Sequence, residues 1–207
     1  MFTGIIQTMA QVAWVKPASR LLQYALILPE KFLHQLNVGA SISVQGVCQT
    51  VVNIEGAHVA FDAIEETLKR TSIADFKPQQ RVNIERCAKF GDEIGGHILS
   101  GHIIGFGKIH QIQTLSSEQR IVTIECSPSL MKYIFAKGYI ALDGASLTVV
   151  DTDPQGRFTV HLIPETLRLT TFGQAQVGDK VNIEIDSQTQ AIVETVERVL
   201  ATHSLST

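Results

Sequence analysis

The sequence has little charge, no basic block and no long apolar run, and each shortage excludes a class of protein. Charged residues make up 18% of the 207 positions and the formal net charge is −3, so the chain lacks the positive surface that drives binding to nucleic acids or anionic membranes. Gly, His, Ser or a charge interrupts every apolar stretch before it reaches the roughly 20 residues of a membrane span. We therefore expect no nucleic-acid and no membrane partner. The hydrophobic share of 44% suffices for one core or two small ones in a soluble globular protein.

Cysteine is also scarce. Cys48, Cys87 and Cys126 are an odd number spaced far apart, which suits neither a disulfide framework nor a Cys-x-x-Cys metal or redox site. We interpret Cys87 and Cys126 as reduced packing residues. Residues 1–6 carry no positive side chain ahead of a long apolar run, so they do not read as a secretory signal and a cytoplasmic protein is the expectation.

What the sequence does contain is an internal repeat. Two copies of about 90 residues indicate a duplicated domain, because a solenoid needs three or more short repeats to bury its faces. We predict an N-terminal domain at 1–97, a second domain at 98–187 and a C-terminal helix at 188–207. The matching blocks are 46–52 with 144–150, 66–71 with 165–170, and 82–85 with 181–184, and the openings 4–6 and 102–104 are aligned so that Gly4 matches His102.

Both halves are predicted to be all-β. Short β-branched and aliphatic runs are separated by Gly, Asp or Pro, and several alternate apolar with polar residues, as strands buried on one face do. Several short strands in so small a unit favour a closed barrel, since closure removes exposed strand edges. The clearest strands are 40–44, 50–54, 58–62, 122–126 and 181–185, with short helical turns near 30–36 and 129–135.

The C-terminal segment changes to a helical period. Ser187 and Gln190 have the spacing of a capping box, which places the start of the helix just after the second domain. The apolar stripe packs either on its own barrel or against equivalent helices of other subunits, and periodicity alone does not decide between them. The stripe consists of Ile192, Val193, Val196, Val199 and Leu200.

The glycine-rich segment 95–105 joins the halves and contains two histidines. His97 and His102 would face opposite sides of a strand, and neither has a histidine four positions away as in a zinc-binding helix, so we predict no metal. We interpret His97 as part of a turn between the barrels. His102 is a candidate for proton transfer, because glycines in a strand pattern mark close approach of a ligand and histidine titrates near neutral pH.

The repeated Gly-x-(Cys/Ser)-x-Thr segment predicts a related pocket in each half. It places Cys48 with Thr50, and Ser146 with Thr148, on one face of equivalent strands. A simple tight turn is the alternative, but recurrence at one register favours paired binding sites. Glu66-Thr67 and Glu165-Thr166 add groups suited to a polyol or a heterocyclic amide, although a solvated loop would look the same. We find no Gly-x-Ser-x-Gly elbow and no phosphate-binding loop, so neither acyl-transfer hydrolysis nor a nucleotide cofactor is indicated.

These segments together resemble the riboflavin synthase family over nearly the whole chain. The resemblance implies two six-stranded Greek-key barrels, each binding one 6,7-dimethyl-8-ribityllumazine, and a C-terminal helix that joins three chains into a homotrimer. It implies a dismutation that yields riboflavin and 5-amino-6-(D-ribitylamino)uracil without cofactor or metal, with lumazine synthase as a further partner. The segments that carry it are 1–6, 46–51, 95–97, 100–102, 143–149 and 162–167.

The resemblance also implies the site residues, with the first barrel of one subunit meeting the second barrel of a neighbour. The first-barrel pocket would use Cys48, Gln49, Thr50, Asp62, Ala63, Ile64, Glu65, Glu66, Thr67, Gly101, His102 and Ile103. The second-barrel pocket would use Lys137, Ser146, Leu147, Thr148, His161, Leu162, Ile163, Pro164, Glu165 and Thr166, closed by Gly4, Ile5 and Ile6. In catalysis, His102 and Thr148 would handle protons, Ser146 and Cys48 would deliver or activate a nucleophile at C7, and Asp143 and Asp186 would support them.

One residue departs from the family pattern. Gln49 stands where an apolar residue, commonly Leu, is usual, and we expect it to alter ligand affinity in the first barrel. The alternative function is that of a lumazine protein, a non-catalytic relative that binds a lumazine or flavin as an optical antenna. A structural adaptor is the third reading, but it would leave the doubled polar segments unexplained. Two intact pockets favour the enzyme.

Overall fold

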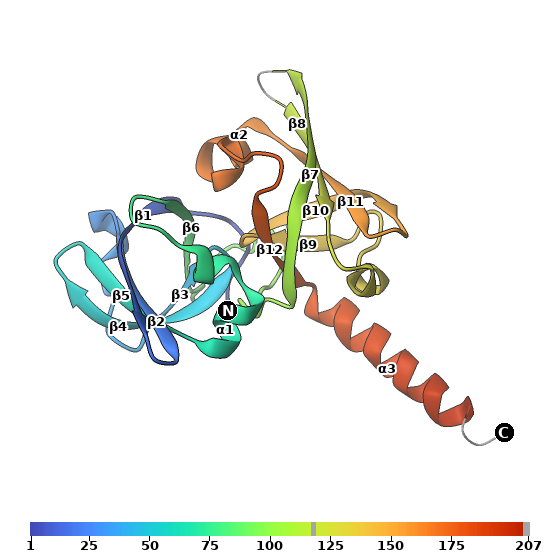
Figure 1. The fold of residues 1–207 in the computed structure, drawn as a ribbon, viewed down its shortest axis with the longest axis horizontal. Helices are drawn as coiled ribbons and strands as arrows, with labels where there is room; N and C mark the ends of the chain where they lie inside the picture. Colours follow the sequence, from blue (N-terminus) through green and yellow to red (C-terminus); the bar gives the residue numbers. More distant parts are fainter. Residues whose placement is uncertain (117–118, 205–207) are drawn as a thin grey trace.

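The chain forms two closed six-stranded antiparallel barrels followed by one long helix, in a computed structural model that describes residues 1–116 and 119–204 (Figure 1). The first barrel consists of β1 (Thr8–Ala18), β2 (Leu21–Ile27), β3 (Ser41–Val44), β4 (Val47–Glu55), β5 (His58–Ile64) and β6 (Arg81–Arg86). The second consists of β7 (Gly105–Ser116), β8 (Gln119–Glu125), β9 (Tyr139–Leu142), β10 (Ala145–Asp153), β11 (Arg157–Leu162) and β12 (Lys180–Ile185). The predicted all-β duplication is confirmed.

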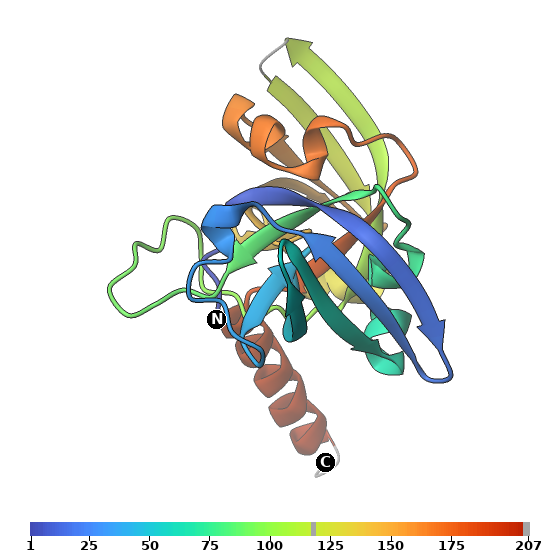
Figure 2. The same cartoon turned by 90° about the vertical axis from the view of Figure 1, so that its left-hand side faces the viewer.

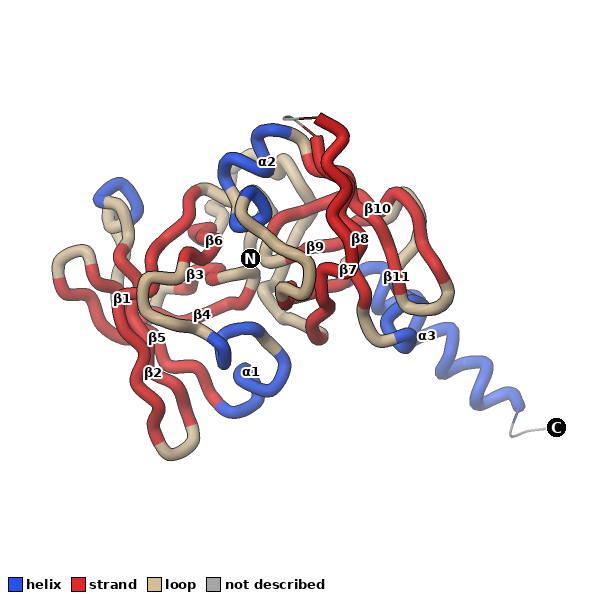
Figure 3. Tube along the Cα trace, turned by 45° about the horizontal axis from the view of Figure 1, so that its top comes forward, coloured by secondary structure: helices blue, strands red, loops and turns tan. Residues whose placement is uncertain are grey.

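The barrels close with the same strand order. Around the first barrel the order is β1-β2-β5-β4-β3-β6, and around the second it is β7-β8-β11-β10-β9-β12. Closure pairs each strand on both sides and protects its edges. Short helices lie at matching places, with α1 and α2 following β5 and β11 (Figure 3). They are η1 (Glu30–Phe32), α1 (Glu65–Arg70), η2 (Ser72–Asp75), η3 (Pro128–Tyr133), α2 (Pro164–Leu169) and η4 (Thr171–Gly173), of which η1 and η3 confirm the predicted turns.

Each barrel encloses its own apolar core. On β5, the alternating residues Val59, Phe61 and Ala63 are fully buried, as expected for a strand with one inward face. A smaller apolar cluster is separate from the two barrel cores. In it Phe2 packs with Leu99, and the two backbones exchange hydrogen bonds of 2.8 and 2.9 Å. The start of the chain therefore pairs with the connection between the barrels, part of which loops outward (Figure 2).

The two opening segments are exchanged between the barrels. The Gly4 carbonyl accepts a hydrogen bond from Ser146 N in the second barrel (2.8 Å), and the Gly101 carbonyl accepts one from Cys48 N in the first (2.9 Å). Both glycines are left-handed, with φ of 76° and 78°, and a Cβ on either would lie 2.5–2.6 Å from the Cβ of its partner. Gly4 therefore corresponds to Gly101. The predicted match of Gly4 with His102 is wrong by one residue, because backbone conformation and close approach set the register.

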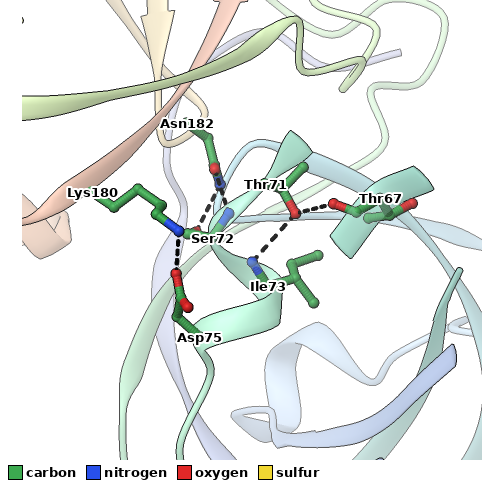
Figure 4. Close-up of polar contacts among 7 residues, drawn as sticks. All are labelled: Thr67, Thr71, Ser72, Ile73, Asp75, Lys180 and Asn182. Carbon is green, nitrogen blue, oxygen red and sulfur yellow. Dashed lines mark hydrogen bonds and ion pairs between the residues drawn. The ribbon is translucent and has the colours of Figure 1, made fainter. Parts of the chain in front are cut away.

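A pseudo-symmetric seam joins the barrels through two fully buried asparagines. The Asn182 Oδ1 accepts a hydrogen bond from Ser72 N at 2.7 Å (Figure 4). The Asn182 Nδ2 donates to the Gln45 carbonyl at 2.8 Å. The Asn83 Oδ1 accepts from Thr171 N (2.8 Å), and its Nδ2 donates to the carbonyl of residue 143 (3.0 Å). These hydrogen bonds, three of them buried, fix one barrel against the other.

The C-terminal helix α3 (Ser187–Ser204) projects away from the barrels (Figure 1). Its cap is Asp186, whose Oδ2 accepts from the backbone N and Oγ1 of Thr189 (2.9 and 2.8 Å). The predicted Ser187–Gln190 capping box is therefore wrong, since an aspartate one residue earlier satisfies the free N–H of the first turn. Val193 packs against the second core, whereas the remaining stripe residues Ile192, Val196, Val199 and Leu200 are 50–64% exposed. Within the described residues, no helix is both long and apolar enough to span a bilayer.

Candidate functional site

The first-barrel pocket is a hollow of about 530 Å³ between β4, α1 and the exchanged segment that follows Leu99. It brings together Cys48, Glu66, Thr67, Gly101, His102 and Ile103, all of which were expected there. The remaining lining residues are Val47, Arg70, Thr71, Ile104 and Gln190. Neither Arg70 nor Gln190 was predicted to line a pocket.

A buried glutamate shapes the turn that presents His102. The Glu184 Oε1 accepts hydrogen bonds from Ser100 N (2.7 Å) and Ser100 Oγ (2.8 Å), and Gly101 N donates to both carboxylate oxygens at 3.1 Å. Burial raises the pKa of Glu184, while these hydrogen bonds and the nearby His102 lower it. The carboxylate therefore holds the segment rigidly while the imidazole of His102 stays exposed to the pocket.

The second-barrel pocket is smaller, about 190 Å³, and lies between β10, α2 and the exchanged N-terminal segment. Glu85 repeats the role of Glu184, accepting hydrogen bonds from Thr3 N (2.6 Å), Thr3 Oγ1 (2.7 Å) and Gly4 N (3.1 Å), and burial raises its pKa. The expected residues Gly4, Ile5, Ile6, Ser146, Ile163, Glu165 and Thr166 line this pocket, together with Ala145, Leu169 and Thr170.

Ser146 has a histidine partner that sequence reasoning missed. His97 Nδ1 lies 2.6 Å from Ser146 Oγ, and its ring stacks on Tyr139 with centroids 5.0 Å apart. The ring is buried, and its Nε2 has no hydrogen-bond partner in the part of the chain that the structure describes. Burial lowers the pKa of His97, and the charge of Asp186 opposes that shift. With its Nδ1 unprotonated, this imidazole is positioned to accept the proton of the Ser146 hydroxyl.

The spacing of His97 in the sequence indicates a turn and gives no sign of its contact with Ser146. The available signal was the preceding Gly96. A Cβ on Gly96 would lie 2.4 Å from the Thr3 carbonyl oxygen and 2.6 Å from Ser146 Cβ. Only glycine therefore allows the backbone at residue 96 to lie this close to Thr3 and Ser146. That close approach brings His97 against the serine, and it becomes visible only once the N-terminal segment has crossed to the second barrel.

Asp143 lies in the seam between the barrels and lines neither pocket. It is fully buried, its Oδ1 accepts from Asn182 N (2.8 Å), and its carboxylate also interacts with the Gln45 amide. Burial raises the pKa of Asp143 to about 8, against the lowering effect of these hydrogen bonds. Asp186 is the helix cap, and it acts on the site through its charge near His97.

Gln49 points into the first barrel. The Tyr24 hydroxyl donates to Gln49 Oε1 (3.2 Å), and Gln49 Nε2 donates to the Cys48 carbonyl (3.0 Å). Both side chains are buried, so the glutamine supplies the acceptor for a tyrosine in the core. Other predicted residues also fall outside the two linings, and their roles stay predictions: Thr50, Asp62, Ala63, Ile64, Glu65, Lys137, Leu147, Thr148, His161, Leu162 and Pro164.

Two closed barrels with matching pockets define a protein with a duplicated domain and a candidate ligand pocket in each half. The family model described as Lumazine binding domain matches residues 3–87 and again 100–186. Riboflavin synthase of Escherichia coli (strain K12) is 48% identical over 97% of this chain and 94% of that protein, and riboflavin synthase of Chlamydia pneumoniae is 41% identical over 97% and 98%. The solved structure of LumP complexed with riboflavin superimposes with a TM-score of 0.83 at 25% identity, covering 90% of this chain and all of that one. The chain belongs to the riboflavin synthase family, and it is an enzyme.

Proposed function

We propose that the chain converts two molecules of 6,7-dimethyl-8-ribityllumazine into riboflavin and 5-amino-6-(D-ribitylamino)uracil. The observation that carries this proposal is the pair of related but unequal pockets. Cys48 and His102 line one, and Ser146, whose hydroxyl contacts the buried His97, lines the other. A reaction between two molecules of one compound needs both to be bound at the same time. Two related pockets, one from each copy of the repeated domain, raise the effective concentration of one molecule near the other.

The pockets supply complementary chemistry. In the second-barrel pocket, His97 takes the proton of Ser146, so that the serine or a water held by it adds to C7 of one lumazine. In the first-barrel pocket, His102 takes a proton from the acidic C7 methyl of the other lumazine. Cys48 and Thr148 assist in nucleophile and proton handling, while Asp143 and Asp186 act from outside the linings. Among the described residues, no group of three His, Cys, Asp or Glu side chains could hold a metal ion.

We further propose that three chains assemble through α3. The helix projects from the barrels with Ile192, Val196, Val199 and Leu200 exposed along it, which supports packing against equivalent helices. Such an assembly would bring the first-barrel pocket of one subunit to the second-barrel pocket of the next. The cytoplasmic location and the partnership with lumazine synthase are proposed on the family resemblance.

The test is turnover of 6,7-dimethyl-8-ribityllumazine by the purified protein without metal or nucleotide, with riboflavin followed by absorbance. We expect one riboflavin for every two lumazines consumed. Tight binding without turnover would overturn the proposal and assign the chain to the alternative, a non-catalytic lumazine- or flavin-binding antenna protein.

A further inference from the structure

The two pockets differ in charge at positions that the repeat makes equivalent. Because Gly4 corresponds to Gly101, the residues that follow, Ile5 and His102, occupy the same place at the edge of their pockets. One is aliphatic and the other can carry a proton.

A second difference lies at the end of the short helix beside each pocket. α1 ends at Arg70 and α2 at Leu169, and both residues line their pockets. Each is followed by a threonine whose hydroxyl donates to the carbonyl four residues earlier, at 2.7 Å for Thr71 and 2.6 Å for Thr170. The helices therefore end in the same geometry, and a guanidinium in the first pocket replaces an aliphatic side chain in the second.

Arg70 reaches across the mouth of the first-barrel pocket. Its Nε contacts the Glu66 carboxylate, and its Nη1 donates to the Ile104 carbonyl at 3.4 Å. The guanidinium thus bridges α1 and the segment that carries His102. Since 55% of its side chain is exposed, it remains accessible to a ligand in the pocket.

We propose that the first-barrel pocket holds the lumazine that loses its C7-methyl proton, and that Arg70 stabilises the resulting anion. The inference rests on the function proposed above. The C–H bond of the methyl group breaks, the proton passes to the imidazole of His102, and the electron pair spreads into the heterocycle, where the guanidinium of Arg70 pairs with it. The second-barrel pocket, with Ile5 and Leu169 at the equivalent positions, holds the neutral lumazine that receives the nucleophile.

The surrounding charges support this division. Glu184, whose carboxylate accepts hydrogen bonds from Ser100 and Gly101, fixes the segment that presents His102 to the first-barrel pocket. In the second repeat, Glu165 is paired with Arg168, which is not among the residues lining the second-barrel pocket. The lining of the first-barrel pocket therefore contains both the imidazole of His102 as proton acceptor and the guanidinium of Arg70 as cation, a combination that the second-barrel pocket lacks.

The test measures ionisation of bound 6,7-dimethyl-8-ribityllumazine by absorbance across a pH series, in a Ser146→Ala background that slows turnover. Adding Arg70→Leu, which copies the second repeat, is expected to lower the anion fraction roughly tenfold at a given pH, and Arg70→Lys to restore part of it. The matched control is Lys69→Leu, which removes a neighbouring cation of α1 that pairs with Glu65 outside the pocket, and it is expected to change nothing.

A second readout separates charge stabilisation from a structural role. Riboflavin lacks the acidic C7 methyl of the lumazine heterocycle and forms no such anion. Its affinity is therefore expected to stay within about twofold in Arg70→Leu if the pocket is intact. Unchanged ionisation in Arg70→Leu, or an equal loss of riboflavin binding, would overturn the inference. Failure of the unmodified protein to form riboflavin would instead overturn the proposed function, so the two failures are distinguishable.

Discussion

Gln49 and Tyr24 form a polar pair inside the first barrel, and each explains the other. A buried tyrosine hydroxyl needs an acceptor, and the glutamine provides it at 3.2 Å. Gln49→Leu is expected to destabilise the protein by about 1–3 kcal/mol because it leaves that hydroxyl unsatisfied. Combining it with Tyr24→Phe should recover most of the loss. Urea unfolding of the two single variants and the double variant measures the coupling.

Riboflavin affinity is the second measurement on the Gln49–Tyr24 pair, and it tests whether Gln49 also acts on the ligand. Because the side chain of Gln49 faces the core, Gln49→Leu is expected to leave affinity nearly unchanged, contrary to the expectation from sequence. A large loss of affinity at unchanged stability would show that the side chain acts on the ligand after all.

The lowered pKa of His97 leads to a prediction for the pH dependence of the reaction. Burial lowers its pKa from the ordinary value of 6.5, so the imidazole remains neutral, and able to accept the Ser146 proton, to lower pH than a free histidine would. Activity should therefore fall only as the pH drops below 6.5 and through the lowered pKa. His97→Gln is expected to reduce kcat by about 10²–10⁴ and to abolish this acid limb.

Replacing the neighbouring Asp186 with Asn removes its negative charge and retains the N-cap of α3. Its negative charge raises the pKa of His97, so Asp186→Asn should shift the acid limb to lower pH. Asparagine caps helices as well as aspartate does, so stability should change little. An acid limb that is identical in all three proteins would show that His97 is not the titrating group.

At the scale of elements, the helix α3 carries the prediction about assembly. A charge in its exposed stripe, as in Val196→Asp or Val199→Asp, is expected to disrupt packing between helices and yield monomers with folded barrels. Arg198→Asp on another face of the helix is the control and should remain assembled. Light scattering with size-exclusion chromatography gives the mass, and circular dichroism reports the barrels. A Val196→Asp protein with the unmodified mass would contradict the proposed role of α3.

The strands and helices were predictable from the local sequence pattern. The exchange of the two opening segments between the barrels was not. Alternation in segments such as 181–185 and the internal repeat were sufficient to predict two closed barrels. The crossing of the N-terminal segment to Ser146 depends on contacts between residues more than a hundred positions apart. Its register rests on the left-handed conformation of Gly4 and Gly101, which residue identity alone does not reveal. The pairing of His97 with Ser146 follows from that crossing, and it was missed for the same reason.

At the scale of the whole molecule, the seam between the barrels contains one ionisable group that the pseudo-symmetry does not repeat. Asp143 occupies the place that Gln45 occupies in the first half, and burial raises its pKa from 3.8 to about 8. The folded protein therefore keeps a proton that the unfolded chain has already lost, so this contribution to stability is complete below pH 3.8 and disappears as the pH rises through 8.

Denaturation across pH tests this consequence for the seam. Between pH 6 and 8 the unfolding free energy should decrease by up to about 1.4 kcal/mol per pH unit from this group. Asp143→Asn, which does not titrate, should flatten that slope. Urea midpoints measured at each pH for both proteins give the difference. Equal slopes would show that Asp143 is ionised in the folded protein throughout this range.

In the proposed reaction, the first-barrel pocket of one chain acts together with the second-barrel pocket of another. The most direct measurement mixes two inactive variants by co-expression with different affinity tags, His102→Gln in the first pocket and Ser146→Ala in the second. Mixed assemblies contain contacts in which both pockets are intact, so riboflavin formation should return to about a quarter of the unmodified rate for random mixing. A mixed assembly as inactive as either parent would contradict the account.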